Sequence, residues 1–308
     1  MPDKEKQKKV AEKWGNRLVN FILALSFCFV TYVLLQVFAV TSFKIPSDSM
    51  EPSLLAGDYI LVDKCSGGAR LFDLLGALEK EEVKIHRVPG WRNFKRNDVL
   101  VFNFPYPGRW DSLALDMMQY YVKRCIAVPG DTLEIRDAHY AIRGLELIPG
   151  DVSAQDELQK VIESGTAEER GIVLESYPNR EEIGWDIQKF GPLYIPGKGS
   201  TVRMDFRNRL LYSNMIEWEQ KKRLSVRGDS VLLGDSVIRQ YCFRENYYFV
   251  SGDKMINSRD SRYWGLLPEP FVVGKVALIW KSQDTLNGKI RWNRVLKKVE
   301  STATISLL

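Results

Sequence analysis

One stretch near the N-terminus restricts what this chain can fold into. From residue 18 to residue 40 the sequence LVNFILALSFCFVTYVLLQVFAV has no charged side chain in 23 positions. A helix rises about 1.5 Å per residue, so this run spans the roughly 30 Å hydrocarbon core of a bilayer. A cleaved signal peptide has a shorter apolar core, about 7 to 15 residues, and Ala39-Val40-Thr41 is a poor cleavage site. We therefore expect a retained transmembrane helix over 18–40, in contact with the lipid bilayer, rather than a buried core helix.

The basic residues around this run predict its orientation. Six Lys and Arg side chains precede it, and only Lys44 follows within the next twenty residues. Since basic segments stay in the cytoplasm, we expect residues 1–17 to be a cytoplasmic tail and everything after Val40 to lie outside. Three acidic residues share the tail, so it holds +3 of the net charge of +5. The remainder does not support an extended nucleic-acid face, and we expect no nucleic-acid partner.

The rest of the chain has the pattern of a β protein. The composition, 45% apolar and 27% charged, is that of a chain that folds. Helical signals are few, with 73–82 and 154–164 the best candidates. Apolar runs bounded by Gly, Pro, Asp or Asn predict strands near 59–63, 98–104, 120–128, 132–135, 230–233, 247–250 and 272–280. These signals predict an antiparallel β fold with a large insertion from about 138 to 245.

Cysteine and histidine usage narrows the chemistry. The four cysteines include no C-x-x-C pair, which argues against a structural zinc site, and we expect no metal and no cofactor. A disulfide among Cys65, Cys125 and Cys242 stays open. The chain has two histidines, His86 and His139, and neither stands in a recognisable catalytic setting. A nucleophile in this chain therefore needs a base other than histidine.

Four segments carry candidate chemistry. In chain order they are IPSDSMEPSL (45–54), RNDVLVF (96–102), YVKRCIAVPGD (121–131) and GDKMINSRDSRYWG (252–265). Alone, two serines flanked by prolines can simply form a turn, and a strand lysine is usually exposed. Together, in this order behind a membrane helix, the segments resemble the conserved boxes of bacterial type I signal peptidase (leader peptidase). That family is a membrane-bound Ser-Lys endopeptidase that removes signal peptides from exported preproteins.

The resemblance implies roles for the central residues. Ser49, before Met-x-Pro, matches the nucleophile, and Lys123, in Tyr-Val-Lys-Arg, matches the general base. Ser47 matches the residue whose hydroxyl forms the oxyanion hole with the backbone N–H of Ser49. Ser258 matches a serine that hydrogen-bonds the lysine and orients it. The site would need no metal, because the two side chains perform the chemistry.

Other matches concern support and specificity. Asp260 and Arg262 correspond to a charged pair that holds the last box against the strand bearing Arg124. Ile45 and Val122 correspond to apolar residues lining pockets that accept small side chains one and three residues before the cut. The resemblance thus implies preprotein partners with small residues at those two positions, and an enzyme in the bacterial cytoplasmic (inner) membrane. It predicts no oligomeric state.

The chemistry of the residues agrees with these roles. A serine hydroxyl is a weak nucleophile, and a lysine can activate it where burial disfavours the ammonium form. Strand alternation puts Lys123 on one face with Tyr121, Cys125 and Ala127, and Arg124 on the other. Lys123 can therefore be buried among apolar groups while Arg124 pairs elsewhere.

The predicted architecture combines these elements. A cytoplasmic tail (1–17) and a transmembrane helix (18–40) precede an extracytoplasmic catalytic core (41–137 and 246–308), into which a β-rich cap domain (138–245) is inserted. The aromatic stretch 102–110 is either an interfacial or a packed loop. Asn97 and Lys254 depart from the family pattern, and Asp48 puts a carboxylate between the two serines.

Two alternatives compete with the enzyme. A non-enzymatic, single-span periplasmic adaptor would explain the helix and the strands, but not the serine and lysine boxes. A Ser-Lys self-cleaving regulator fused to a DNA-binding domain would explain the boxes. The membrane helix and the lack of a basic DNA-reading module argue against that regulator.

Overall fold

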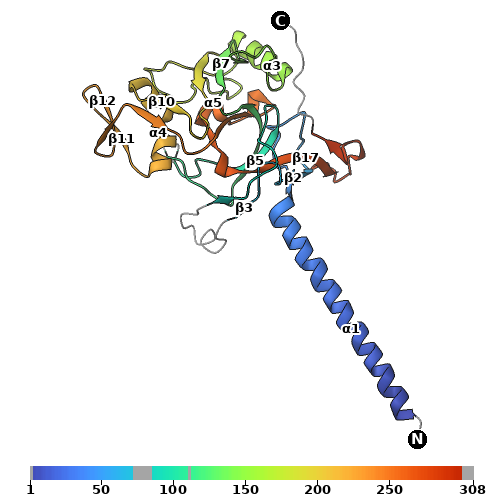
Figure 1. The fold of residues 1–308 in the computed structure, drawn as a ribbon. Helices are drawn as coiled ribbons and strands as arrows, with labels where there is room; N and C mark the ends of the chain where they lie inside the picture. Colours follow the sequence, from blue (N-terminus) through green and yellow to red (C-terminus); the bar gives the residue numbers. More distant parts are fainter. Residues whose placement is uncertain (1–2, 72–84, 110–111, 300–308) are drawn as a thin grey trace.

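A long helix stands apart from the rest of the molecule. The computed structural model describes residues 3–71, 85–109 and 112–299 (Figure 1). Helix α1 (Asp3–Leu34) continues into a π-helical turn (Leu35–Ala39), and its side chains from Glu12 to Leu35 are exposed. In the described part of the chain, Glu12–Ala39 is the one segment whose length and composition suit a membrane crossing. The helix ends one residue before the predicted limit at Val40, and it includes most of the predicted tail.

One antiparallel sheet forms the centre of the molecule. Its strand order is β1-β2-β17-β5-β6-β15-β16, with β18 paired to β17. The strands are β1 (Val40–Lys44), β2 (Asp58–Asp63), β5 (Val99–Asn103), β6 (Tyr120–Ala127), β15 (Tyr247–Ser251), β16 (Leu267–Pro268), β17 (Val272–Ser282) and β18 (Lys297–Lys298). Each of the predicted runs in this set is a strand. The predicted fold class, mostly antiparallel β with an N-terminal apolar helix of membrane-span length, is confirmed.

Both faces of the central sheet are covered, which explains the burial pattern of its strands. All five residues of β5 are buried, as in a strand with apolar packing on each side. Leu100 and Phe102 belong to the larger apolar core, whereas Val99 and Val101 belong to a smaller one. This period of two is that of a β-strand. The smaller core also contains Ile45, Met50 and Leu54 of the serine box, so that segment is packed against the sheet.

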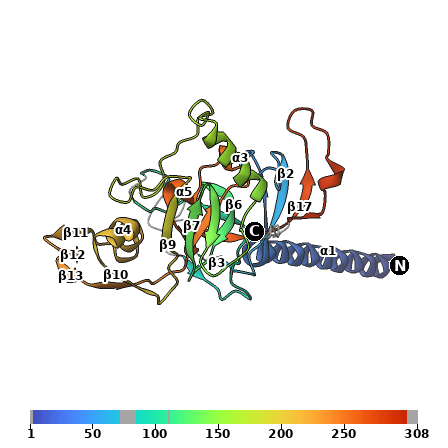
Figure 2. The same cartoon turned by 90° about the horizontal axis from the view of Figure 1, so that it is seen from above.

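Smaller elements surround the sheet. The strands are β3 (Arg70–Leu71) with β4 (His86–Arg87), β7 (Thr132–Arg136) with β8 (His139–Ile142) and β9 (Phe190–Tyr194), β10 (Thr201–Arg203) with β14 (Gln240–Cys242), and β11 (Leu224–Arg227) with β12 (Ser230–Leu233) and β13 (Ser236–Ile238). The helices are α3 (Val152–Glu163), α4 (Phe206–Gln220) and α5 (Ser261–Trp264), with 3-10 turns η2 (Met255–Asn257), η3 (Glu269–Phe271) and η4 (Trp292–Arg294). Helix α4 lies with β11 and β12 at the end of the molecule away from α1 (Figure 1 and Figure 2).

Two helix predictions have different outcomes. The helix expected at 154–164 is α3, whereas the one expected at 73–82 lies outside the described residues. Helix α4 was not predicted, although Asp205 caps it by accepting from the backbone N–H of Asn208. Its buried Leu211 and Met215 are four residues apart, which is helical spacing.

The division into a core and a cap domain stays a prediction. Strand β7, which belongs to the predicted core, pairs with strands β8 and β9 of the predicted cap.

Two smaller questions from the sequence are answered by packing. Phe104 and Tyr106 are buried and contact the ring of Trp264, so these two aromatic side chains of the 102–110 stretch pack inside the fold, whereas Gly108 and Arg109 are exposed. All four cysteines are described and none forms a disulfide. Cys125 is buried, and burial raises the pKa of its thiol.

Candidate active site

The serine box forms a turn that is fixed at both ends. Ile45 is buried, its backbone N–H donates to Asp58 O (2.8 Å), and its carbonyl accepts from Gly57 N (2.9 Å). Further along, Met50 and Leu54 are buried in the smaller core. Buried apolar side chains on either side therefore hold the turn, and Ser49 lies on it with a partly exposed side chain.

Lys123 meets this turn from strand β6. Its register opposite Leu100 of β5 places it inside the central sheet, and its side chain is only 3% exposed. The Lys123 Nζ donates to Ser49 Oγ over 2.6 Å. The neighbouring β6 residues Tyr121 and Cys125 belong with the larger core and Val122 with the smaller one, which is the predicted alternation. The alternation does not extend to Ile126, which lies in the larger core together with Cys125 and Ala127.

The environment of Lys123 favours a neutral amine. Burial lowers the lysine pKa from 10.5 to about 8, with a smaller lowering by Arg262, while the carboxylates of Asp260, Asp253 and Asp48 act in the opposite direction. A shift of that size corresponds to about 3 kcal/mol against the ammonium form. A neutral amine at hydrogen-bond distance can accept the proton of the serine hydroxyl. The arrangement is therefore chemically able to activate Ser49 near neutral pH.

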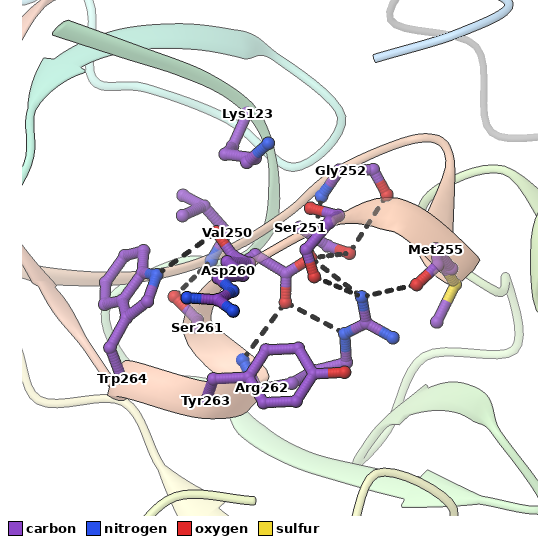
Figure 3. Close-up of polar contacts among 12 residues, drawn as sticks. Lys123, Val250, Ser251, Gly252, Met255, Asp260, Ser261, Arg262, Tyr263 and Trp264 are labelled. Carbon is purple, nitrogen blue, oxygen red and sulfur yellow. Dashed lines mark hydrogen bonds and ion pairs between the residues drawn. The ribbon is translucent and has the colours of Figure 1, made fainter. Parts of the chain in front are cut away.

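A buried ion pair supports the region beneath Lys123 (Figure 3). The Asp260 carboxylate accepts from Arg262 Nε (2.8 Å) and Nη2 (2.9 Å), and both side chains are fully buried. Asp260 also accepts from the Gly252 backbone N–H (3.0 Å) and the Ser251 hydroxyl (3.2 Å). Burial alone would raise the pKa of Asp260, but the guanidinium outweighs it and holds that pKa below its ordinary value. The pair thus fixes the last box against the end of β15.

Arg124 links the other boxes to one another. It donates to both carboxylate oxygens of Asp253 (2.6 and 2.7 Å), to Asn97 O (2.9 Å) and to Ser53 Oγ (3.0 Å). Asp253 received no role from the sequence, although it stands in the Gly-Asp pair of the last box. A buried arginine needs a carboxylate partner, and this rule could have indicated from the sequence that Arg124 pairs with an aspartate such as Asp253. Asp260 and Arg262 bond to each other, and Asp260 also accepts from Ser251, the residue of β15 that pairs with Arg124 of β6.

The predicted lysine-orienting serine lies close by but is not bonded. Ser258 is 8% exposed, and among the described residues its Oγ has no hydrogen-bond partner. It packs against Gly252, where an added Cβ would lie 2.3 Å from Ser258 Oγ and 2.6 Å from Ser49 O. Ser47 is exposed on the other side of Asp48. The expected bond from Ser258 to Lys123 is thus not present in this structure.

The two predicted pocket residues share one environment. Ile45 is buried in the smaller core, and Val122, partly buried, packs against the same core. A separate open pocket of about 500 Å³ is lined by Ser258 and Tyr263 and, from another segment, by residues that include Ile172, Glu175 and Asn179. In the described ranges no group of His, Cys, Asp and Glu could hold a metal ion.

Comparisons with known proteins identify the family of the chain. The signal peptidase I of Buchnera aphidicola subsp. Acyrthosiphon pisum is 28% identical over 276 residues, which cover 87% of this chain and 77% of the relative. The signal peptidase I of Aquifex aeolicus is 26% identical over 265 residues, which cover 85% of this chain and 82% of the relative. A crystal structure of a signal peptidase I from Enterococcus faecalis V583 is 20% identical and covers 60% of this chain and 97% of that one, at a TM-score of 0.26 that is too low to compare the folds. The family described as signal peptidase, peptidase S26, matches residues 18–281, and the chain therefore belongs to this family of serine peptidases.

Proposed function

We propose that this chain is a membrane-anchored endopeptidase that removes signal peptides from exported preproteins, with Ser49 as nucleophile and Lys123 as general base. The observation that carries the proposal is the 2.6 Å contact between Ser49 Oγ and a lysine that is almost completely buried. Membership of the signal peptidase family supports the substrate class. The alternative of a non-enzymatic adaptor is not favoured, because it gives no reason to bury a lysine beside a serine.

The proposed reaction follows the usual path of acyl transfer. Neutral Lys123 takes the proton of the Ser49 hydroxyl while Oγ attacks the scissile carbonyl carbon. The oxyanion is stabilised by the Ser49 backbone N–H and the Ser47 hydroxyl. Lys123 then passes its proton to the departing amine as the peptide C–N bond breaks. In the second half Lys123 takes a proton from water as the water oxygen attacks the acyl-enzyme ester carbon. The ester C–O bond to Ser49 Oγ then breaks, and Lys123 returns the proton to Oγ, which restores the serine hydroxyl and the neutral amine and releases the new carboxylate end.

The proposed anchor suits this class of substrate. Helix α1 and the following turn would lie in the bacterial cytoplasmic membrane, with the basic N-terminal segment in the cytoplasm. The chain from β1 onward would then lie outside, close to the membrane surface from which a signal peptide emerges. The resemblance assigns Ile45 and Val122 to the substrate pockets, and both lie in one apolar environment. As in that family, we expect small side chains at the last and third-last positions before the cut.

The experiment combines cleavage with mapping. The detergent-solubilised full chain is incubated with a preprotein that has Ala-x-Ala before its cut, and the new N-terminus is sequenced by mass spectrometry. We expect one cut directly after the second alanine, no cut by Ser49→Ala, and normal activity of Ser225→Ala, an exposed serine of β11. Phe at the last position should block cleavage. An active Ser49→Ala protein, or equal cutting of the Ala and Phe preproteins, would contradict the proposal.

A further inference from the structure

The carboxylate of Asp48 stands next to the proposed reaction centre. It lies between Ser47 and Ser49 in the sequence, where a bare negative charge would oppose an oxyanion and favour protonated Lys123. About a third of its side chain is exposed, so burial does not neutralise it. A nucleophile held in this setting needs a compensating positive charge.

Lys254 supplies that charge from the last box. Its Nζ donates to Asp48 Oδ2 over 2.6 Å and to Glu51 Oε2 over 3.1 Å. Asn257 adds bonds of 3.0 Å to both Asp48 oxygens. The pair therefore joins two segments that are 206 residues apart in the chain. These bonds act on the carboxylate itself: the bond from Lys254 comes first among the effects that hold the Asp48 pKa below its ordinary value.

The main chain places Lys254 at the nucleophile as well. Its backbone N–H donates to Ser49 O over 3.1 Å. This approach depends on Gly252, since a Cβ there would lie 2.6 Å from the same oxygen. The charge of Lys254 is thus held at a fixed place relative to Ser49.

We propose that Lys254 is a positioning residue that neutralises Asp48 beside the Ser49–Lys123 pair, and so keeps Lys123 available as a base. The proposal rests on the proposed function. It joins the two departures from the family pattern, Asp48 and Lys254, into a single compensated pair. The lysine at 254 is needed because the carboxylate at 48 is present.

The charges around Lys123 give the direction of the effect. Asp260, Asp253 and Asp48 favour its ammonium form, and Arg262 opposes it. The Asp260 carboxylate is matched by Arg262, and that of Asp253 by Arg124. The Asp48 carboxylate is matched by Lys254, which also forms an ion pair with Glu51. Removing the Lys254 charge alone therefore leaves a negative charge in excess.

The test is a double-mutant cycle read through the pH dependence of kcat/KM. In Lys254→Met the acid limb should move up by about half a pH unit, which lowers kcat/KM at pH 7 about threefold. In Asp48→Asn it should move down by a similar amount. The double variant, which removes both charges, should return to the wild-type limb. Lys254→Arg keeps the positive charge, so the acid limb should stay at its wild-type pH. The control Lys222→Met removes an exposed lysine remote from Asp48 and should also leave the acid limb unchanged.

The same proteins are also titrated without substrate, so that the result does not depend on turnover. Lysine is labelled with ¹³C at Cε, and the signal missing from Lys123→Met identifies the group. We expect the same two opposite shifts and the same return in the double variant. Shifts in one direction for both single variants, or an unmoved titration in Lys254→Met, would overturn the proposal. If the titration shifts as expected while the wild-type protein fails to cleave, it is the proposed function that is wrong.

Discussion

Replacing Lys123 by Met should make the protein more stable at pH 7 while abolishing its activity. In the folded protein burial lowers the lysine pKa from 10.5 to about 8, so the ammonium form is disfavoured by about 3 kcal/mol. Met has a similar volume and no charge to desolvate. Losing the bond to Ser49 Oγ costs about 1 kcal/mol. The free energy of unfolding should therefore rise by about 2 kcal/mol at pH 7.

The gain should depend on pH in a defined way. Below pH 8 Lys123 is protonated in both the folded and the unfolded state, so the wild-type protein bears the full penalty. Between about 8 and 10.5 only the unfolded state binds the proton, and wild-type stability rises by about 1.4 kcal/mol per pH unit. Above pH 10.5 the penalty is gone, and the Met variant should be the less stable protein by about 1 kcal/mol.

Thermal unfolding followed by tryptophan fluorescence in detergent measures this. At pH 7 the Tm of Lys123→Met should exceed that of the wild type by roughly 4–8 °C, at about 2–4 °C per kcal/mol. Lys222→Met, which removes an exposed lysine, should show no such difference. A Met variant less stable than wild type at pH 7, or a Tm difference that is the same at pH 7 and pH 10.5, would refute the reasoning.

Three further outcomes are expected. The kcat/KM should rise tenfold per pH unit up to about pH 8, as Lys123 loses its proton, and Lys123→Arg should be inactive throughout in the preprotein assay. Asp253→Asn leaves the buried guanidinium of Arg124 without its carboxylate and should lower the free energy of unfolding by about 3–5 kcal/mol in urea titrations; a loss below 1 kcal/mol would contradict this. Gly252→Ala should lower kcat about tenfold or more, because its Cβ would lie 2.6 Å from the main-chain oxygen of Ser49, the proposed nucleophile. Gly108→Ala meets nothing within 4 Å and should have normal activity.

The parts of the fold that could be predicted depend on local patterns. The strands follow from residues that are close in sequence: in β6 the alternation of Tyr121, Lys123 and Cys125 with Val122 and Arg124 indicates a strand, although both of its faces are buried from Lys123 to Ala127. Helix α4 has an equally local signal, because Asp205 is an N-cap residue, and this signal could have indicated the start of the helix. The transmembrane prediction required only length and composition, and the helix ends at Ala39, one residue from the expected limit.

The parts that could not be predicted depend on which distant groups meet. The resemblance paired Ser49 with Lys123, but it did not indicate that Asp253 would be the carboxylate of Arg124. Nor did it indicate that Asp48 would be bonded to Lys254. Spacing in the sequence cannot decide such pairings, because several carboxylates and basic groups have suitable positions and only the packed sheet selects among them.

The bonds of Arg124 explain why four separate segments form one site. A buried guanidinium has five N–H donors in a fixed plane, and each needs an acceptor. Here the acceptors include Ser53 of the serine box, Asn97 of the second box and Asp253 of the last box. Because Lys123 is the next residue on the same strand, satisfying Arg124 also fixes the place of the lysine relative to the serine turn. The positioning of the Ser49–Lys123 pair is therefore a consequence of burying Arg124, which ties the geometry of the site to the stability of the fold.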